Sequence, residues 1–113
     1  MVIKIDGIHK LKGHIFCNRT IESVTSEEYF GKPVYVFHFP PINGGGYLSW
    51  NNDFRIFLYR EPKNGIYEMY WMGLHGVTCQ RLDISEIRNF HTFYSYLEKV
   101  VRLAKQYWDE NTK

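Results

Sequence analysis

The sequence has few of the features that mark specialised classes of protein. It contains only two cysteines, Cys17 and Cys79, and no apolar stretch near the roughly 20 residues that a membrane-spanning helix needs. Two cysteines make no disulfide framework, so we expect both to be buried free thiols. No apolar segment follows Met1, so we expect no export signal, no membrane partner and a cytoplasmic location.

An excess of charge of one sign is also missing. The 14 Lys and Arg face 12 Asp and Glu, and the net charge of +2 is too balanced for an obvious nucleic-acid-binding or membrane-surface protein. The N-terminal twenty residues are more basic, with four cations against one acid: Lys4, Lys10, Lys12 and Arg19 against Asp6. We expect a solvated strand edge there, with a phosphate site as the alternative.

No catalytic or phosphate-binding motif of high specificity is present. The sequence has no Gly-x-Ser-x-Gly elbow, and Gly44-Gly45-Gly46 is not followed by Lys and Ser or Thr. Cys79 near His75 is the one local pairing of a nucleophile with a base, and Asp83 is the nearest acid. We therefore expect no catalytic residues and no cofactor, and an enzyme is the third candidate.

Two pairs of metal-ligand type stand apart in the sequence, His14 with Cys17 and His75 with Cys79. Residues three apart in a strand point to opposite faces, which disfavours the first pair, whereas glycines beside the second pair fit a turn. We expect buried thiols and surface imidazoles rather than a metal site. Metal analysis of protein purified without added metal tests this.

Aromatic side chains are what the sequence has in excess, at 18% of the residues. Eight lie between positions 47 and 71: Tyr47, Trp50, Phe54, Phe57, Tyr59, Tyr67, Tyr70 and Trp71. Because side chains alternate along a strand, Phe54 falls on one face with Ile56 and Leu58, while Phe57 falls on the other with Tyr59. One helix covers only one face, so more sheet, a partner or a ligand must cover the second.

Alternation and turn residues predict strands over most of the chain. The expected strands are 2–6, 14–17, 20–24, 34–39, 47–50, 54–60, 66–72 and 77–82. Turns are expected at 51–53, at Asn64-Gly65 and at 73–76. Thr25 and Glu28 form a capping-box pattern, and Gly31 can end a helix, so we predict a short helical turn over 26–30.

The C-terminal segment predicts one long amphipathic helix. Its apolar residues recur at helical spacing: Phe90, Phe93, Leu97, Val100, Val101, Ala104 and Trp108. Asp83 with Glu86, or Asn89, is expected to cap its start, and Glu98 with Arg102 to pair on its wet face. Together these elements predict a single α+β domain over 1–113, in which a curved or partly closed antiparallel meander packs against the helix.

The candidate binding residues lie in the aromatic strands and in one loop. Six residues would fall on or near one sheet face of the meander: Arg55, Tyr59, Tyr67, Met69, Trp71 and Arg81. The loop residues Gly44, Gly45 and Gly46 are candidates to close over a ligand or to reshape against a partner, and a plain long turn is the favoured alternative. At least half of the aromatic residues are expected to serve the core instead.

These observations favour a small, non-enzymatic protein-binding protein of the inhibitor, immunity or adaptor type, whose partner is another protein or a second copy. The alternative is a protein that binds single-stranded nucleic acid through the same aromatic face and the basic N-terminal segment. Closure of the sheet is decisive, because a closed sheet would turn most of the aromatic residues into core.

Overall fold

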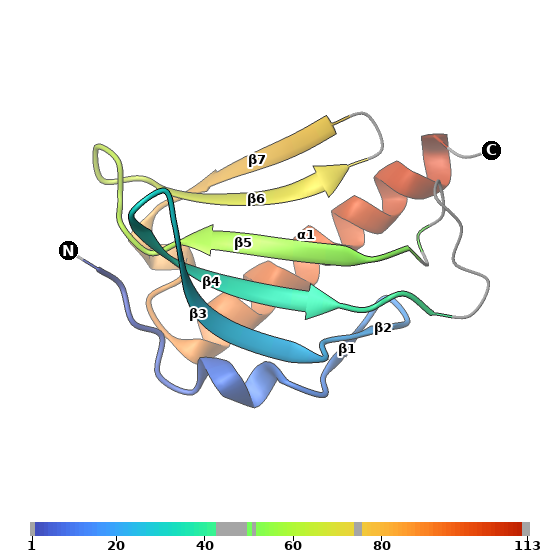
Figure 1. The fold of residues 1–113 in the computed structure, drawn as a ribbon, viewed down its shortest axis with the longest axis horizontal. Coiled ribbons are helices and arrows are strands. Elements are labelled where there is room, and N and C mark those ends of the chain that lie inside the picture. Colours follow the sequence, from blue (N-terminus) through green and yellow to red (C-terminus); the bar gives the residue numbers. More distant parts are fainter. Residues whose placement is uncertain (1, 43–49, 51, 74–75, 112–113) are drawn as a thin grey trace.

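The computed structural model of the chain describes residues 2–42, 50, 52–73 and 76–111. The elements are, in order, η1 (Ile8–Leu11), β1 (Ile15–Phe16), β2 (Arg19–Thr20), β3 (Ser23–Tyr29), β4 (Lys32–Phe39), β5 (Phe54–Tyr59), β6 (Tyr67–Gly73), β7 (Gly76–Leu82), η2 (Ile84–Glu86) and α1 (Phe90–Asn111). Strands β3 to β7 form a five-stranded antiparallel sheet in chain order, and β1 with β2 forms a two-stranded one (Figure 1). The predicted α+β class is confirmed.

The five-stranded sheet is open. Over the described residues β3 and β7 each pair with a single neighbouring strand, so the sheet does not close into a barrel. Helix α1 runs behind the sheet in the view of Figure 1 and covers that face alone. The ring of Phe37 on β4 packs 5.3 Å from the ring of Phe93 on α1, which marks the centre of the core between the two layers.

The predicted helix and its cap at Asn89 are confirmed. The apolar stripe of α1 is buried from Phe93 to Trp108. Asn89 Oδ1 accepts a hydrogen bond of 2.9 Å from the backbone N–H of Thr92 at the helix start. The capping box of Asp83 and Glu86 begins η2 instead of α1, so both cap patterns are used, each for its own helix.

The helical turn predicted over 26–30 is wrong. Strand β3 pairs with β4 along its whole length, from Ser23 opposite His38 to Tyr29 opposite Lys32. A two-residue turn then joins the strands. A capping box supplies hydrogen bonds to the backbone of only one helical turn. Pairing with β4 instead aligns seven residues of β3 in a ladder and buries Val24 in the core, so strand pairing overrides the local pattern.

The N-terminal strand predictions are only partly right. The first expected strand, 2–6, lies outside the strands of the structure: Ile3 donates its N–H to the Arg60 carbonyl oxygen at 2.7 Å, and Ile5 to the Tyr35 hydroxyl at 3.2 Å. One backbone bond to the residue after β5 and one bond to a side chain do not make a ladder. The expected strands 14–17 and 20–24 are reduced to β1, to β2 and to the start of β3.

A strand at 47–50 is not supported at Trp50, which lies outside the strands, and 47–49 lie outside the described residues. Strand β4 instead pairs directly with β5, from Val34 opposite Tyr59 to Phe39 opposite Phe54. The connection between the two strands runs from residue 40 to residue 53.

Arg19 binds described residues at both ends of this connection. Its guanidinium donates from Nη2 to the carbonyl oxygens of Phe39, Pro40 and Asn52 at 2.9, 2.8 and 2.7 Å, and from Nη1 to that of Trp50. The side chain is fully buried, so Arg19 is not part of the solvated basic edge expected from the sequence. Its charge is balanced by carbonyl dipoles that only the folded chain brings together.

Among the described residues, none of the helices combines the length and the apolar character needed to cross a membrane.

Candidate functional site

The face of the sheet that α1 leaves uncovered carries a chain of aromatic rings. The register places Phe57 opposite both Val36 on β4 and Tyr70 on β6, so these side chains share this face, which we call the open face. The ring of Phe57 lies 5.6 Å from that of Tyr29, and the ring of Tyr59 lies 5.6 Å from that of Tyr70. Four aromatic side chains from β3, β5 and β6 thus line one surface.

Part of this aromatic surface serves the fold. Val34 and Val36 point to the open face but are buried, with 0% and 3% of their surface exposed. Phe57 and Tyr59 are the direct cross-strand neighbours of these valines, and both are only half-buried. The rings therefore shield a small second core and still present part of their own surface to solvent.

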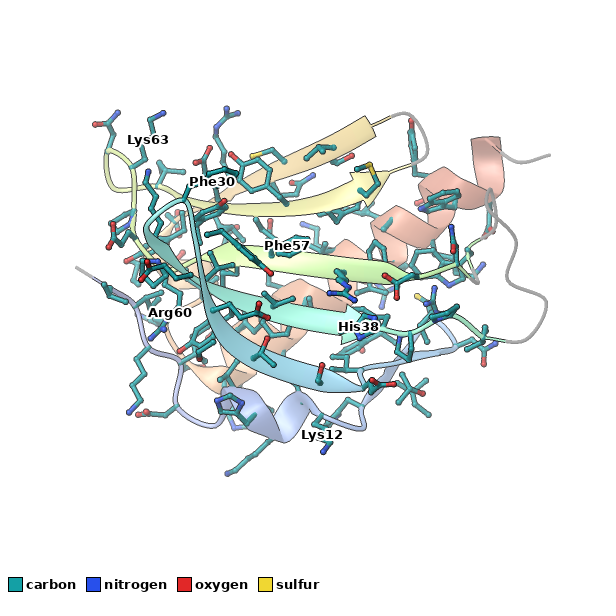
Figure 2. The ribbon with its side chains drawn as sticks, in the orientation of Figure 1. Lys12, Phe30, His38, Phe57, Arg60 and Lys63 are labelled. Atoms are coloured by element: carbon teal, nitrogen blue, oxygen red, sulfur yellow. The ribbon has the colours of Figure 1, made fainter. Side chains whose placement is uncertain are left out.

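The open face is hollowed into a groove of about 780 Å³. Its walls are mostly apolar and include Tyr29, Phe30, Phe57, Tyr59, Tyr70 and Met72. Figure 2 shows Phe57 over the middle of the sheet and Phe30 at the tip of the β3–β4 hairpin, on the same side of the sheet. Binding pockets commonly enclose about 300 to 1,000 Å³, so this groove is large enough for a ligand or for side chains of a partner.

Charged side chains surround the apolar floor. Lys32, Glu61, Lys63 and Glu68 line the groove, and Lys63 also borders a second hollow of about 280 Å³ with Arg81. Among the described residues no ion pair joins Lys32, Lys63 or Arg81 to a carboxylate. The site therefore combines an apolar centre with a mixed, largely unpaired charged rim.

Tyr70 belongs to a polar cluster at the floor. Burial, followed by hydrogen bonding to Cys79 and Glu68, raises the pKa of Tyr70 far above its ordinary value. The Cys79 Sγ lies 3.9 Å from the Glu68 Oε2. The phenol therefore stays protonated at neutral pH and does not serve as a general base.

A second polar cluster lies at the other end of the open face, around His38 (Figure 2). His38 Nε2 lies 2.6 Å from Asp53 Oδ1, and Arg55 Nε lies 3.3 Å from Asp53 Oδ2. Burial raises the pKa of Asp53, but the hydrogen bond and charge of His38 and the charge of Arg55 outweigh burial and hold that pKa below its ordinary value. This cluster ties the ends of β4 and β5 together.

The six predicted sheet residues do not share one face. Arg55, Tyr59 and Arg81 lie on the open face, whereas Tyr67, Met69 and Trp71 are buried on the face toward α1. The register pairs Leu58 with Met69 and Ile56 with Trp71, and both partners belong to the core. Gly44, Gly45 and Gly46 lie outside the described residues.

Sequence reasoning missed Tyr29, Phe30 and Tyr70. A signal for Tyr70 was available: the two-residue turn at Asn64-Gly65 pairs odd positions with even ones, which places Tyr70 on the face of Tyr59. Tyr29 and Phe30 were hidden by the capping-box pattern that predicted a helical turn.

The candidate metal ligands that are described do not converge. The ring of His14 packs 5.4 Å from that of Tyr94 on α1, and the carbonyl oxygen of Cys17 accepts a hydrogen bond from Trp50 Nε1. Cys79 instead lies on the open face beside Glu68, and His75 is outside the described residues. In the part of the chain that is described, no three His, Cys, Asp or Glu side chains are grouped to hold a metal ion.

Comparison with known proteins leaves the site to be interpreted on its own geometry: no protein-family model, no curated protein and no solved structure matches this chain.

Proposed function

We propose that this protein is a small, non-enzymatic protein-binding protein that engages its partner through the open face of the sheet. The observation that carries the proposal is the groove of about 780 Å³ on the one sheet face that α1 leaves uncovered. An inhibitor, immunity factor or adaptor acts in this way, by occupying the surface of another protein. A cytoplasmic location belongs to the same proposal.

The composition of the groove supports a protein partner. Tyr, Phe, Met and Arg are enriched at the centres of protein interfaces, and Phe57, Tyr59, Tyr70, Met72 and Arg55 supply these types on the open face. Large apolar side chains beside a polar rim match the usual anatomy of an interface, with a desolvated centre and a hydrated margin.

Binding of single-stranded nucleic acid is the second candidate, favoured by the rings of Tyr59 and Tyr70 on neighbouring central strands. Two observations weigh against it. Glu61 and Glu68 alternate with the lysines along the same groove, so it lacks the continuous run of cations that a phosphate backbone needs. Arg19, counted in the basic N-terminal segment, is buried and donates only to backbone carbonyls.

Affinity capture from the native host tests the proposal. The wild-type chain and the Tyr59→Ser, Tyr70→Ser and Leu103→Ser variants are compared, since Leu103 is an exposed apolar residue on α1, remote from the open face. We expect a protein that is retained by the wild type and by Leu103→Ser and is lost by both tyrosine variants. Capture of the same proteins in equal amounts by all four chains would contradict the proposal. Capture of nucleic acid alone would favour the second candidate.

A further inference from the structure

Two tight hairpin turns among the described residues, one between β3 and β4 and one between β5 and β6, use the same turn geometry with different residues. Asn64 and Gly65 have φ angles of 55° and 80°, and Phe30 and Gly31 have φ angles of 53° and 76°. Two-residue hairpin turns with positive φ at both central positions strongly favour Asn-Gly, because Asn tolerates the left-handed conformation. The first hairpin places a bulky aromatic residue where the second uses the favoured one.

No packing offsets this backbone strain. The side chain of Phe30 is 96% exposed, more than any other large apolar residue described. Its neighbour Tyr29 behaves differently, since its ring packs on Phe57. Phe30 thus combines a disfavoured conformation with a large solvent-exposed apolar surface, and strained residues of this kind cluster at functional sites.

Phe30 also forms part of the groove wall, together with Lys32 and Lys63. Figure 2 shows the side chains of Phe30 and Lys63 at the same end of the molecule. An apolar ligand bound along Phe57 and Tyr59 would therefore reach Phe30 at that end, where the hairpin tip can contact it from the side.

Cations outnumber carboxylates at this end of the molecule. Lys32 and Lys63 line the groove, Arg81 lies in the adjoining hollow, and none of the three carries an ion pair among the described residues, whereas the Glu68 carboxylate lies 3.9 Å from the Cys79 Sγ. Glu61 is the one other carboxylate that lines the groove. Charge complementarity therefore favours an occupant with acidic groups beside its apolar side chains.

We propose that Phe30 is an anchor residue that holds an acidic, aromatic-bearing segment of a partner protein in the open-face groove. The β3–β4 hairpin keeps Phe30 at this position although the residue lowers the stability of the fold. This inference rests on the proposed function and names the chemistry of the partner. The aliphatic groove walls at Pro62, Met72 and Val77, with no base-stacking role, favour a protein segment over a nucleic acid.

The Phe30→Asn variant tests both halves of the inference, because it installs the turn of the second hairpin. We expect its unfolding equilibrium constant to fall about fivefold or more, since a left-handed conformation costs an ordinary residue about 1 to 2 kcal/mol. Unchanged or lower stability would overturn the claim that Phe30 is kept at a cost.

Binding is measured by titrating the full chain with short synthetic peptides. One peptide carries Phe and Trp among Asp and Glu, a second replaces the aromatic residues with Ser, and a third replaces the acids with Lys. We expect the first to bind at least about tenfold more tightly than the others, and Phe30→Asn to lose about tenfold in its affinity. The Phe30→Tyr and Ile15→Asn variants should keep wild-type affinity, since the first retains the ring and the second alters an exposed residue of β1 outside the groove.

The outcomes separate this inference from the proposed function. Peptide binding that is lost in Tyr59→Ser but kept in Phe30→Asn would overturn the anchor role and leave the open face as the site. A captured host protein together with no binding of the acidic peptide would overturn the partner chemistry alone. Tighter binding of a short single-stranded oligonucleotide, lost in Tyr70→Ser, would overturn the inference and support nucleic-acid binding.

Discussion

Arg19 and Phe39 are joined by a hydrogen bond of 2.9 Å from the guanidinium Nη2 to the backbone carbonyl oxygen at the end of β4. Arg19 lies on β2, in the small two-stranded sheet, so this bond ties the small sheet to the large one. The same guanidinium also binds the carbonyl oxygens of Pro40, Trp50 and Asn52. One buried cation thereby sets where the connection from β4 to β5 leaves the sheet and returns.

Replacing Arg19 with Gln should lower the free energy of unfolding by about 3 kcal/mol or more, because buried carbonyl groups lose charged donors. Urea unfolding followed by circular dichroism measures the change. Arg88→Gln is the matched control: Arg88 is exposed, so its loss should alter stability by no more than about 0.5 kcal/mol. Equal effects of the two substitutions would contradict the bracing role.

Met69 and Met72 lie on the same strand but on opposite faces of the sheet. The same substitution at both positions therefore tests which face is core and which is open. Met69→Ala should cost about 2 to 5 kcal/mol, because Met69 is fully buried under α1. Met72→Ala should change stability by less than about 1 kcal/mol, because Met72 is 60% exposed in the groove. Capture of a partner should show the reverse order, with Met72→Ala weakened and folded Met69→Ala unaffected.

Asn64→Phe copies the Phe30 turn into the second hairpin. We expect the free energy of unfolding to fall by about 1 kcal/mol, because Phe lacks the tolerance of Asn for a φ of 55°. Lys63→Phe adds the same ring at the adjacent position, outside the positive-φ residues, and should change stability by less than about 0.5 kcal/mol. Similar losses in both variants would point to the aromatic ring itself rather than to backbone strain.

The lowered pKa of Asp53 predicts a pH-dependent contribution to stability. Because the pKa in the folded chain lies below the unfolded value of about 3.9, the ionised carboxylate adds stability above about pH 4. That contribution is lost as the pH falls through the folded pKa. Asp53 is half-exposed, so the contribution should be under about 1 kcal/mol.

The measurement compares urea unfolding of the wild type and Asp53→Asn from about pH 6 to about pH 3. The difference in unfolding free energy should narrow toward the acidic end. Arg55→Gln should retain part of the pH dependence, because His38 still contacts the carboxylate. A difference that stays constant over this range would contradict the role of the ion cluster.

Much of the fold follows from local patterns in the sequence. The apolar stripe predicts α1, the Asn64-Gly65 pair predicts the β5–β6 turn, and alternation predicts which residues of β5 share a face. Each of these depends on neighbours within a few residues, where helical or strand periodicity and turn chemistry act directly.

The candidate site depended on contacts between residues far apart in the chain. Tyr29 and Phe30 carried a helical capping pattern, and only pairing with β4 makes them a strand end and a hairpin tip. Arg19 is a surface cation by composition, and only the fold brings together the carbonyl groups that bury it. Backbone pairing and desolvation outweigh local preference in both cases.

The sequence by itself therefore determined α1, the central strands of the sheet, their order and the alternation of side chains between the two faces of each strand. Only the tertiary structure decided which face is core. Side-chain alternation places Phe57 and Ile56 on opposite faces, but it does not determine which of the two faces the helix. That choice depends on the strand register and on packing against Phe93 and its neighbours, which buries Trp71 and leaves Tyr59 and Tyr70 open to a partner.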